Sequence, residues 1–184
     1  MKQETSKMRS LLRKAELPLY KKIHSIQAYL LSKGTYNYST WPTLFGSLMA
    51  KFHGSILCMY RDAAGHYCSA KDVVRMFSDS DILHKYSLVS PITMLRRERL
   101  SLLSRVLRKS PPYVLELVLL SSRFSKGWAY AVTADLEWMN ICNGFGTILH
   151  YQYDLHAWVQ HLTIDPAKFG RSVKKFCNSK FANI

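Results

Sequence analysis

Apolar side chains recur along this chain at the spacing of an α-helix, and this periodicity constrains the fold more than any other feature. In the clearest run they lie three or four positions apart: Phe45, Leu48, Met49, Phe52, Ile56 and Met59. Residues with this spacing share one face of a helix, and Gly65 predicts where that helix ends. No useful length of the sequence alternates apolar and polar residues, so no strand is expected.

Similar stripes, together with proline and capping residues, predict further helices along the rest of the chain. Pro18 is expected to open a helix that ends at Gly34, and Pro91 one that ends before Pro111. Shorter helices are expected over 73–77, 82–89, 113–121 (buried), 128–139, 149–162 and after Asp165. The fold class is therefore all-α, an irregular multi-helix array. We expect an N-terminal helical hairpin with basic helices over 1–65 and a helical bundle with a basic tail over 66–184.

The chain is strongly basic, with 26 Lys and Arg against 12 Asp and Glu, a net charge of +14 over 184 residues. Three blocks carry the excess: 1–33 (net +6), 85–126 (net +7) and 168–184 (net +5). Residues 34–84 are neutral, and 127–167 contain four acids and no Lys or Arg. Such a charge predicts a polyanionic partner: nucleic acid, an acidic protein or an anionic surface.

The predicted helix over 92–109 separates its apolar and basic residues onto different faces. Ser101 and Ser104 fall among the basic residues, and serines beside arginines suit contacts to phosphate. The candidate nucleic-acid-binding residues of the three basic blocks are Lys21, Lys22, Lys33, Arg97, Arg105, Arg108, Lys109, Lys174 and Lys175. A solvated surface without a ligand explains the same pattern, so both interpretations stay open.

Arg99 differs from the other arginines because it projects from the apolar arc of the same helix. A buried guanidinium requires a partner of opposite charge. Asp135 and Glu137 lie in the acidic segment on an otherwise apolar helix. We expect one of these two carboxylates to pair with Arg99.

Motifs for catalysis, metals or cofactors are missing from the sequence. His53, Cys58, His66 and Cys68 do not have the paired spacing of zinc ligands, and no nucleophile elbow or phosphate-binding glycine loop occurs. Asp79 or Asp81 is expected to cap a helix. We expect no enzyme activity, no metal, no cofactor and no transmembrane segment. The expected location is intracellular, in nucleus or cytoplasm, with an organelle not excluded.

Several marker residues resemble a known family. They are the stretch from Leu30 to Trp41, the element Met59-Tyr60-Arg61, the basic stretches 95–100 and 107–111, Trp128 and Asp135-Leu136-Glu137-Trp138. In this order they are similar to the thumb and post-thumb region of non-LTR retrotransposon reverse transcriptases. The resemblance spans about residues 15–140, whereas 141–184 match no part of that region. The fingers and the catalytic palm have no counterpart.

The resemblance implies a thumb-like module that grips a template-primer duplex or structured RNA without performing chemistry. Together with the basic blocks, it predicts a non-catalytic module that binds RNA or an RNA/DNA duplex. Lys21, Lys22, Arg97 and Arg108 would then lie on one continuous face. The alternative is a structural or assembly subunit of a larger ribonucleoprotein or membrane-associated complex. That alternative predicts exposed apolar patches.

Overall fold

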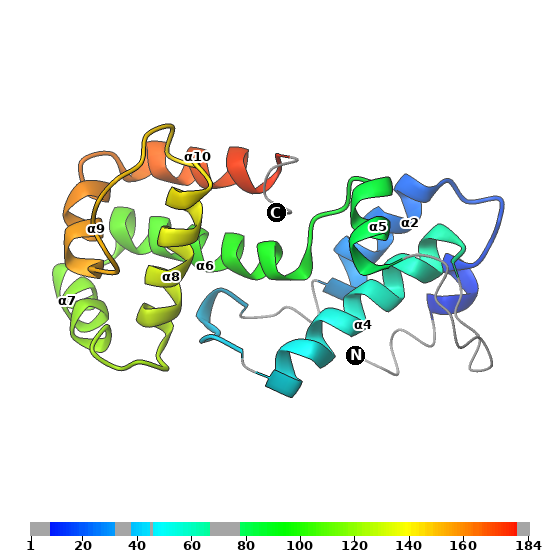
Figure 1. Cartoon of the computed structure of the whole chain (residues 1–184), viewed down its shortest axis with the longest axis horizontal. Helices are drawn as coiled ribbons and strands as arrows, with labels where there is room; N and C mark the ends of the chain where they lie inside the picture. Colours follow the sequence, from blue (N-terminus) through cyan, green and yellow to red (C-terminus); the bar gives the residue numbers. More distant parts are fainter. Residues whose placement is uncertain (1–7, 32–37, 45, 67–77, 180–184) are drawn as a thin grey trace. The chain divides into compact units, whose positions relative to one another are not determined.

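The computed structural model describes residues 8–31, 38–44, 46–66 and 78–179, and all the regular structure in these ranges is helical (Figure 1). The all-α prediction is confirmed. The elements are α2 (Leu19–Ser25), η1 (Ile26–Leu31), η2 (Tyr38–Thr40), α4 (Gly46–Ala64), α5 (Asp79–Lys85), α6 (Pro91–Lys109), α7 (Pro112–Ser121), α8 (Trp128–Ile141), α9 (Leu155–Leu162) and α10 (Pro166–Cys177). None of the described helices is both long and apolar enough to cross a bilayer.

The chain divides into two compact units. Unit 1 consists of residues 1–36 and 46–91, and unit 2 of residues 37–45 and 92–184. The sequence predicted a boundary near Gly65, whereas the units divide after Pro91. The short segment 37–45, which interrupts unit 1 in the sequence, belongs to unit 2. The helices on both sides of Gly65 therefore belong to the same unit.

Unit 1 is organised around α4, which packs against α2 and α5. The predicted stripe of α4 is buried at Phe52, Ile56 and Met59, whereas Leu48 near its start is 61% exposed. Gly65 follows the helix with a φ of +79°, a left-handed conformation that glycine adopts without strain. The helix therefore ends where the sequence predicted.

The start of α5 is fixed by a capping box. The Ser78 hydroxyl accepts a hydrogen bond from the Asp81 backbone, and the Asp81 carboxylate accepts one from the Ser78 backbone. Hydrogen bonds from the Ser78 hydroxyl and backbone lower the pKa of Asp81. The capping role expected of Asp81 is confirmed, but the helix starts at Asp79 instead of residue 82 and ends at Lys85. The short helix expected over 73–77 lies outside the described residues.

Unit 2 contains the larger core, to which α6, α8, α9 and α10 all contribute. Its fully buried side chains include Leu100, Leu103, Val132, Leu136, Trp158 and Val173. Asp165 caps α10 by accepting a hydrogen bond from the Lys168 backbone, and Pro166 occupies the first turn. The N-terminus predicted for this helix is confirmed.

The helix expected over 149–162 is shorter than predicted, since α9 starts at Leu155, six residues later, and ends at Leu162. The Asn140 side chain donates to the Leu149 carbonyl (2.6 Å) and accepts from the Leu149 amide (2.8 Å). Gln152 and Tyr153 have positive φ values, which an α-helix does not accommodate. The first residues of the expected helix thus form a loop bound to α8.

The prediction that the helix over 113–121 is buried is wrong. No residue of α7 is buried, although Leu115, Val118 and Leu119 pack in part against the unit 2 core. The helix is apolar on nearly every side, but only one side meets the protein. The sequence reports its apolar character and not the number of its neighbours.

Candidate nucleic-acid interface

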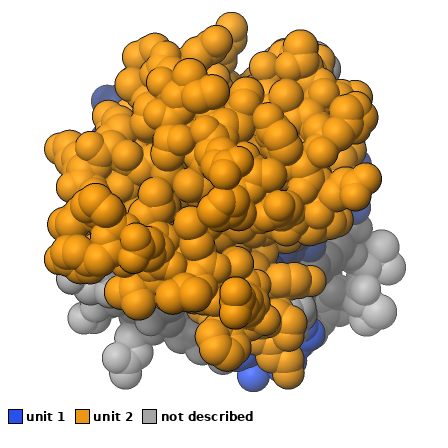
Figure 2. Space-filling view, turned by 90° about the vertical axis from the view of Figure 1, so that its left-hand side faces the viewer, with its two compact units in different colours: residues 1–36, 46–91 blue, residues 37–45, 92–184 orange. Residues whose placement is uncertain are grey.

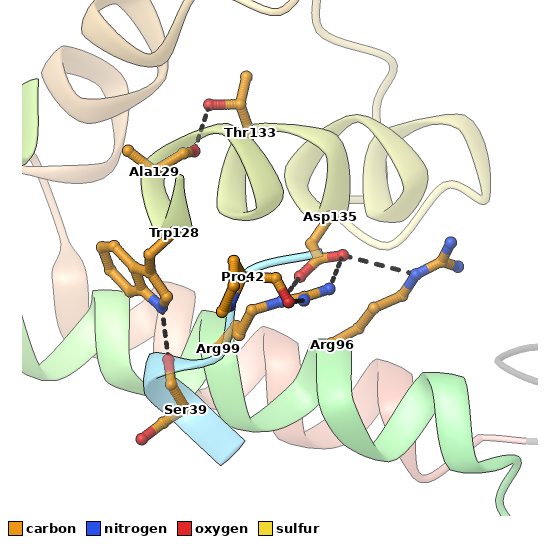
Figure 3. A network of polar contacts seen from close by, with 8 residues as sticks. All are labelled: Ser39, Pro42, Arg96, Arg99, Trp128, Ala129, Thr133 and Asp135. Carbon is orange, nitrogen blue, oxygen red and sulfur yellow. Dashed lines mark hydrogen bonds and ion pairs between the residues drawn. The ribbon is translucent and has the colours of Figure 1, made fainter. Parts of the chain in front are cut away.

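A buried ion pair joins α6 to α8 within unit 2 (Figure 3). Arg99 donates from Nε to Asp135 Oδ2 at 2.6 Å and from a terminal nitrogen to Oδ1 at 2.8 Å. Arg99 and Asp135 are only 5% and 2% exposed. The prediction that one of two carboxylates pairs with Arg99 is confirmed, and the partner is Asp135.

Glu137, the other carboxylate considered for Arg99, has a different role. It accepts hydrogen bonds from the Trp158 indole nitrogen (2.9 Å) and from the Tyr153 amide (3.0 Å). It therefore ties α8 to α9 and to the loop that precedes α9. Two of the four carboxylates of the acidic segment, Asp135 and Glu137, are therefore buried inside unit 2 and do not lower the positive charge of the outer surface.

The segment 38–44 completes this side of unit 2. The Pro42 carbonyl accepts a hydrogen bond from Arg99 at 3.3 Å, and the Ser39 carbonyl accepts one from the Trp128 indole nitrogen (Figure 3). Arg96 is also held internally, because it lies 3.5 Å from the Asp135 carboxylate and its guanidinium lies over the Trp138 ring. The inner face of α6 therefore uses Arg96 and Arg99, and its other cations lie elsewhere.

Three of those other cations, Arg97, Arg105 and Arg108, face α10, which runs antiparallel to α6. The Ser104 hydroxyl donates to the Pro166 carbonyl at 3.0 Å, and Arg97 donates to the Asn178 side chain at 3.4 Å. The beginning of α10 thus lies beside the middle of α6, and its end lies near the first half of α6. Figure 1 shows the two helices side by side.

Between α6 and α10 lies a groove of about 570 Å³, here called the basic groove. It is lined by Arg97, Glu98, Ser101, Ser104, Arg105, Arg108, Ala167, Gly170, Arg171, Lys174 and Asn178. Five of these side chains are cationic and one is a carboxylate. The Ser104 hydroxyl is bonded to Pro166, but the Ser101 hydroxyl lies among the cations, so the groove presents positive charge and hydrogen-bond donors together, as phosphate binding requires.

The cations of the groove differ in how strongly they are held. Arg97 contacts the Glu98 carboxylate at 3.2 Å, and Arg108 donates to the Ser104 carbonyl at 3.3 Å. Arg105, Arg108, Arg171 and Lys174 are exposed, and Arg97 is half-buried. An anion would meet four exposed charges, one of which, Arg108, is held in place by the Ser104 carbonyl.

The structure gathers four of the nine predicted binding residues in the basic groove: Arg97, Arg105, Arg108 and Lys174. Lys109 and Lys175 are exposed on the same two helices but do not line it. Lys21 is exposed in unit 1, and Lys33 lies outside the described residues. A continuous face that joins Lys21 to Arg97 and Arg108 stays a prediction, because Lys21 belongs to unit 1 and the two arginines belong to unit 2.

Lys22 is a correction to the predicted surface, because it is only 7% exposed. It precedes the fully buried Ile26 by four residues, and residues four apart lie on the same helical face. Lys22 therefore lies on the inner side of α2. Its side chain is not part of an accessible basic surface in this structure.

Arg171 lines the groove and was missed by sequence reasoning. It precedes Lys174 by three residues and follows Ala167 by four, so these positions share one face of α10. This spacing could have identified Arg171, because it places Arg171 and Lys174 on one face of α10 and Lys175 on another. The predicted pair Lys174 and Lys175 does not follow the helical geometry.

Gly170 sets how closely α10 approaches α6. A Cβ atom at this position would lie 2.6 Å from the Ser104 Oγ atom. Because Ser104 is 2% exposed and bonded to Pro166, its hydroxyl has little room to move. We expect Gly170→Ala to destabilise the protein by about 1–2 kcal/mol in urea unfolding, despite the higher helix propensity of alanine.

The matched double variant Ser104→Ala with Gly170→Ala removes the oxygen that the new methyl group meets. It should recover at least half of the stability lost by Gly170→Ala. If Gly170→Ala is instead more stable than the natural chain, the close approach of the two helices at this point is wrong.

Side chains suited to metal binding do not cluster near the groove or elsewhere in the described ranges, where no group of three or more His, Cys, Asp or Glu could hold an ion. Burial raises the pKa of the Cys177 thiol to about 11, so at neutral pH it is an uncharged core side chain.

Comparisons of the chain with models of protein families, with curated proteins and with solved structures gave no match.

Proposed function

We propose that this protein is a non-catalytic nucleic-acid-binding module that holds the backbone of RNA or of an RNA/DNA duplex in the basic groove. One observation carries the proposal: cations that are distant in sequence, on α6 and α10, converge on a single groove that also contains the Ser101 hydroxyl. A merely solvated charged face would require no such convergence. The internal use of Asp135 and Glu137 leaves Glu98 as the one carboxylate that lines the groove.

The groove is suited to reading a backbone and not a base sequence. Along α6, Arg97 and Arg108 are eleven residues apart, which corresponds to about 16 Å of helix. On a B-form DNA duplex that length would span roughly five base-pair steps of one strand. Guanidinium and hydroxyl groups that contact phosphates fix position without specifying sequence, so we expect little sequence preference.

The choice of RNA or an RNA/DNA duplex depends on the resemblance to the thumb region of non-LTR reverse transcriptases. In that proposal, residues 1–65 take the place of the thumb, and α6 and α8 take the place of the basic helical region beyond it. The segment 141–184, which the resemblance does not cover, supplies α10 and therefore half of the basic groove. The groove is thus a feature of this chain as a whole.

The proposal is tested by fluorescence anisotropy with end-labelled 16-base-pair RNA, RNA/DNA and DNA duplexes over a salt series. With three to five phosphates neutralised, the logarithm of the association constant should fall with the logarithm of salt concentration with a slope of about −3 to −5. The variant Arg105→Ser with Arg171→Ser should reduce the steepness of that slope by about two. At 0.1 M salt it should weaken binding by roughly 50-fold.

The control variant Lys126→Ser with Lys168→Ser removes the same charge from exposed positions of unit 2 that do not line the groove. It should keep most of the affinity. If control and groove variants weaken binding equally, binding reflects net charge alone and the groove is not the site. Binding that hardly changes with salt would exclude a backbone contact of this kind.

A second function, a subunit of a larger assembly, is favoured by a different observation. Large apolar side chains on α7 and in the turn after it are exposed, with Tyr113 at 63% and Phe124 at 70%. Exposed apolar side chains that lie together mark interaction surfaces. Nucleic-acid binding through α6 and α10 does not use these residues.

A further inference from the structure

The exposed apolar residues of α7 form a regular line along one side of the helix. Their exposed fractions are 63% for Tyr113, 61% for Leu117, 55% for Leu120 and 70% for Phe124. We call these four residues the α7 seam. Figure 2 views unit 2 from the end at which Figure 1 draws α7 and α9.

The spacing within the α7 seam is that of a helix-pairing surface. Successive members are four, three and four residues apart. Tyr113, Leu117 and Leu120 therefore follow a single narrow line along α7, and Phe124 lies three residues beyond the end of the helix. After the last helical residue, successive turns continue the backbone as far as Phe124, whose amide bonds the Ser121 carbonyl at 3.1 Å. The opposite side of α7 already packs on the unit 2 core through Leu115 and Leu119.

One flank of the α7 seam carries a residue of each charge. Glu116 and Arg123 line the same groove, of about 490 Å³, together with Leu120 and with Asp154 and His156 at the start of α9, so both lie on the same side of the seam. They are seven residues apart, or about 10 Å along the helix. In the part of the chain that the structure describes, neither side chain has an ion-pair partner.

We propose that α7 pairs antiparallel with α7 of a second copy of this chain. Around a two-fold axis, each contact occurs twice with the roles of the two chains exchanged. With the axis near the middle of the seam, Leu117 packs on the partner's Leu120, and Tyr113 packs on the partner's Phe124. In this arrangement Glu116 faces the partner's Arg123, and the reverse contact is made at the other end.

Charge complementarity identifies a second copy as the occupant. In an antiparallel pair of identical helices, a given flank of one helix faces the same flank of the other. For these flanks to attract each other, each must carry a positive and a negative residue, placed symmetrically about the centre of the seam. The midpoint between Glu116 and Arg123 lies within about one residue of the midpoint of the seam along the chain, so this flank meets the condition. An anionic lipid surface or an acidic helix would bring negative charge against Glu116. A parallel pair would place the charged flank opposite Val114 and Ser121.

The pairing is expected to be weak and to respond to salt differently from nucleic-acid binding. Three side chains on a ten-residue helix and one in the turns after it make a small interface, typical of transient association. Two chains of charge +14 repel each other, and salt screens that repulsion. Moderate salt should therefore favour pairing while it weakens nucleic-acid binding. The inference does not rest on the proposed nucleic-acid function.

Sedimentation equilibrium of the full chain tests the pairing, from about 5 to 500 μM, where small interfaces associate. The apparent mass should rise with concentration from 21.3 kDa toward twice that value. Leu117→Ser should hold it at the single-chain value. Glu116→Arg and Arg123→Glu should each lower the association constant about tenfold, and the double reversal should restore it. Circular dichroism checks that every variant keeps its helix content and melting temperature.

The double reversal distinguishes the antiparallel pair from general stickiness of the apolar residues. If it associates as weakly as the single reversals, the antiparallel register is wrong. A constant mass of 21.3 kDa over the whole range would overturn the proposal. The proposal would also fail if that constant mass came with binding to phosphatidylserine vesicles that Leu117→Ser abolishes, since α7 would then be a lipid-binding face.

Discussion

Asp135→Ala is expected to lower the free energy of unfolding by about 3–5 kcal/mol, the largest effect of a single substitution in unit 2. The change removes the carboxylate that binds Arg99 at 2.6 and 2.8 Å and lies 3.5 Å from Arg96. Arg99 is 5% exposed, so water cannot replace the lost partner. Urea unfolding followed by circular dichroism measures the loss.

The double variant Arg99→Met with Asp135→Leu is the matched control, because it removes both charges and keeps an apolar volume. It should recover most of the stability lost in Asp135→Ala, since a buried ion pair offers little net advantage over a well-packed apolar pair. If Asp135→Ala leaves the unfolding midpoint unchanged, Arg99 does not depend on Asp135. A double variant no more stable than Asp135→Ala would mean that the loss does not arise from an unpaired charge.

Trp158→Ala should have the second largest effect, a loss of about 3–5 kcal/mol. Trp158 is fully buried at the centre of the unit 2 core. Its ring centre lies 4.9 Å from that of Tyr151 and 5.3 Å from that of Phe145. The substitution leaves a cavity among these rings and removes the indole donor to Glu137. Thermal and urea unfolding monitored at 222 nm measure the loss.

Trp158→Phe separates packing from hydrogen bonding at the same position. It keeps most of the apolar volume but leaves Glu137, which is 8% exposed, with one donor fewer. An expected loss of about 1–3 kcal/mol would correspond to that unsatisfied carboxylate. If Phe and Ala at this position are equally destabilising, the hydrogen bond to Glu137 dominates and the aromatic packing contributes little.

Helix existence could be predicted from the sequence wherever apolar periodicity coincided with a strong terminal residue. The bounds of α6 and the start of α10 agree with the prediction because proline and aspartate act locally, through backbone geometry and a single hydrogen bond. Arg99 was found by the same logic, since a charge within an apolar arc requires a partner. Which carboxylate supplies it depends on the packing of α8, and the sequence left both open.

The errors share a physical cause, which is that they concern contacts between elements. Whether α7 is covered depends on its neighbours and not on its own composition. The late start of α9 follows from the bonds between Asn140 and Leu149. The basic groove brings Arg105 together with Arg171, and no local pattern predicts which faces of two distant helices meet. Four of its cations were nevertheless identified, because each already lay on a polar helical face.

The segment 38–44 has a consequence for how the protein is made. Its Ser39 and Pro42 carbonyls satisfy Trp128 and Arg99, but the ribosome synthesises them long before either partner emerges. During translation the carbonyls of this segment stay hydrated until α6 and α8 have left the ribosomal exit tunnel. A shortened gene product that begins after Pro91 would lack these acceptors from the start. A gene rearrangement that separates the sequence at Pro91 would therefore lower the stability of unit 2.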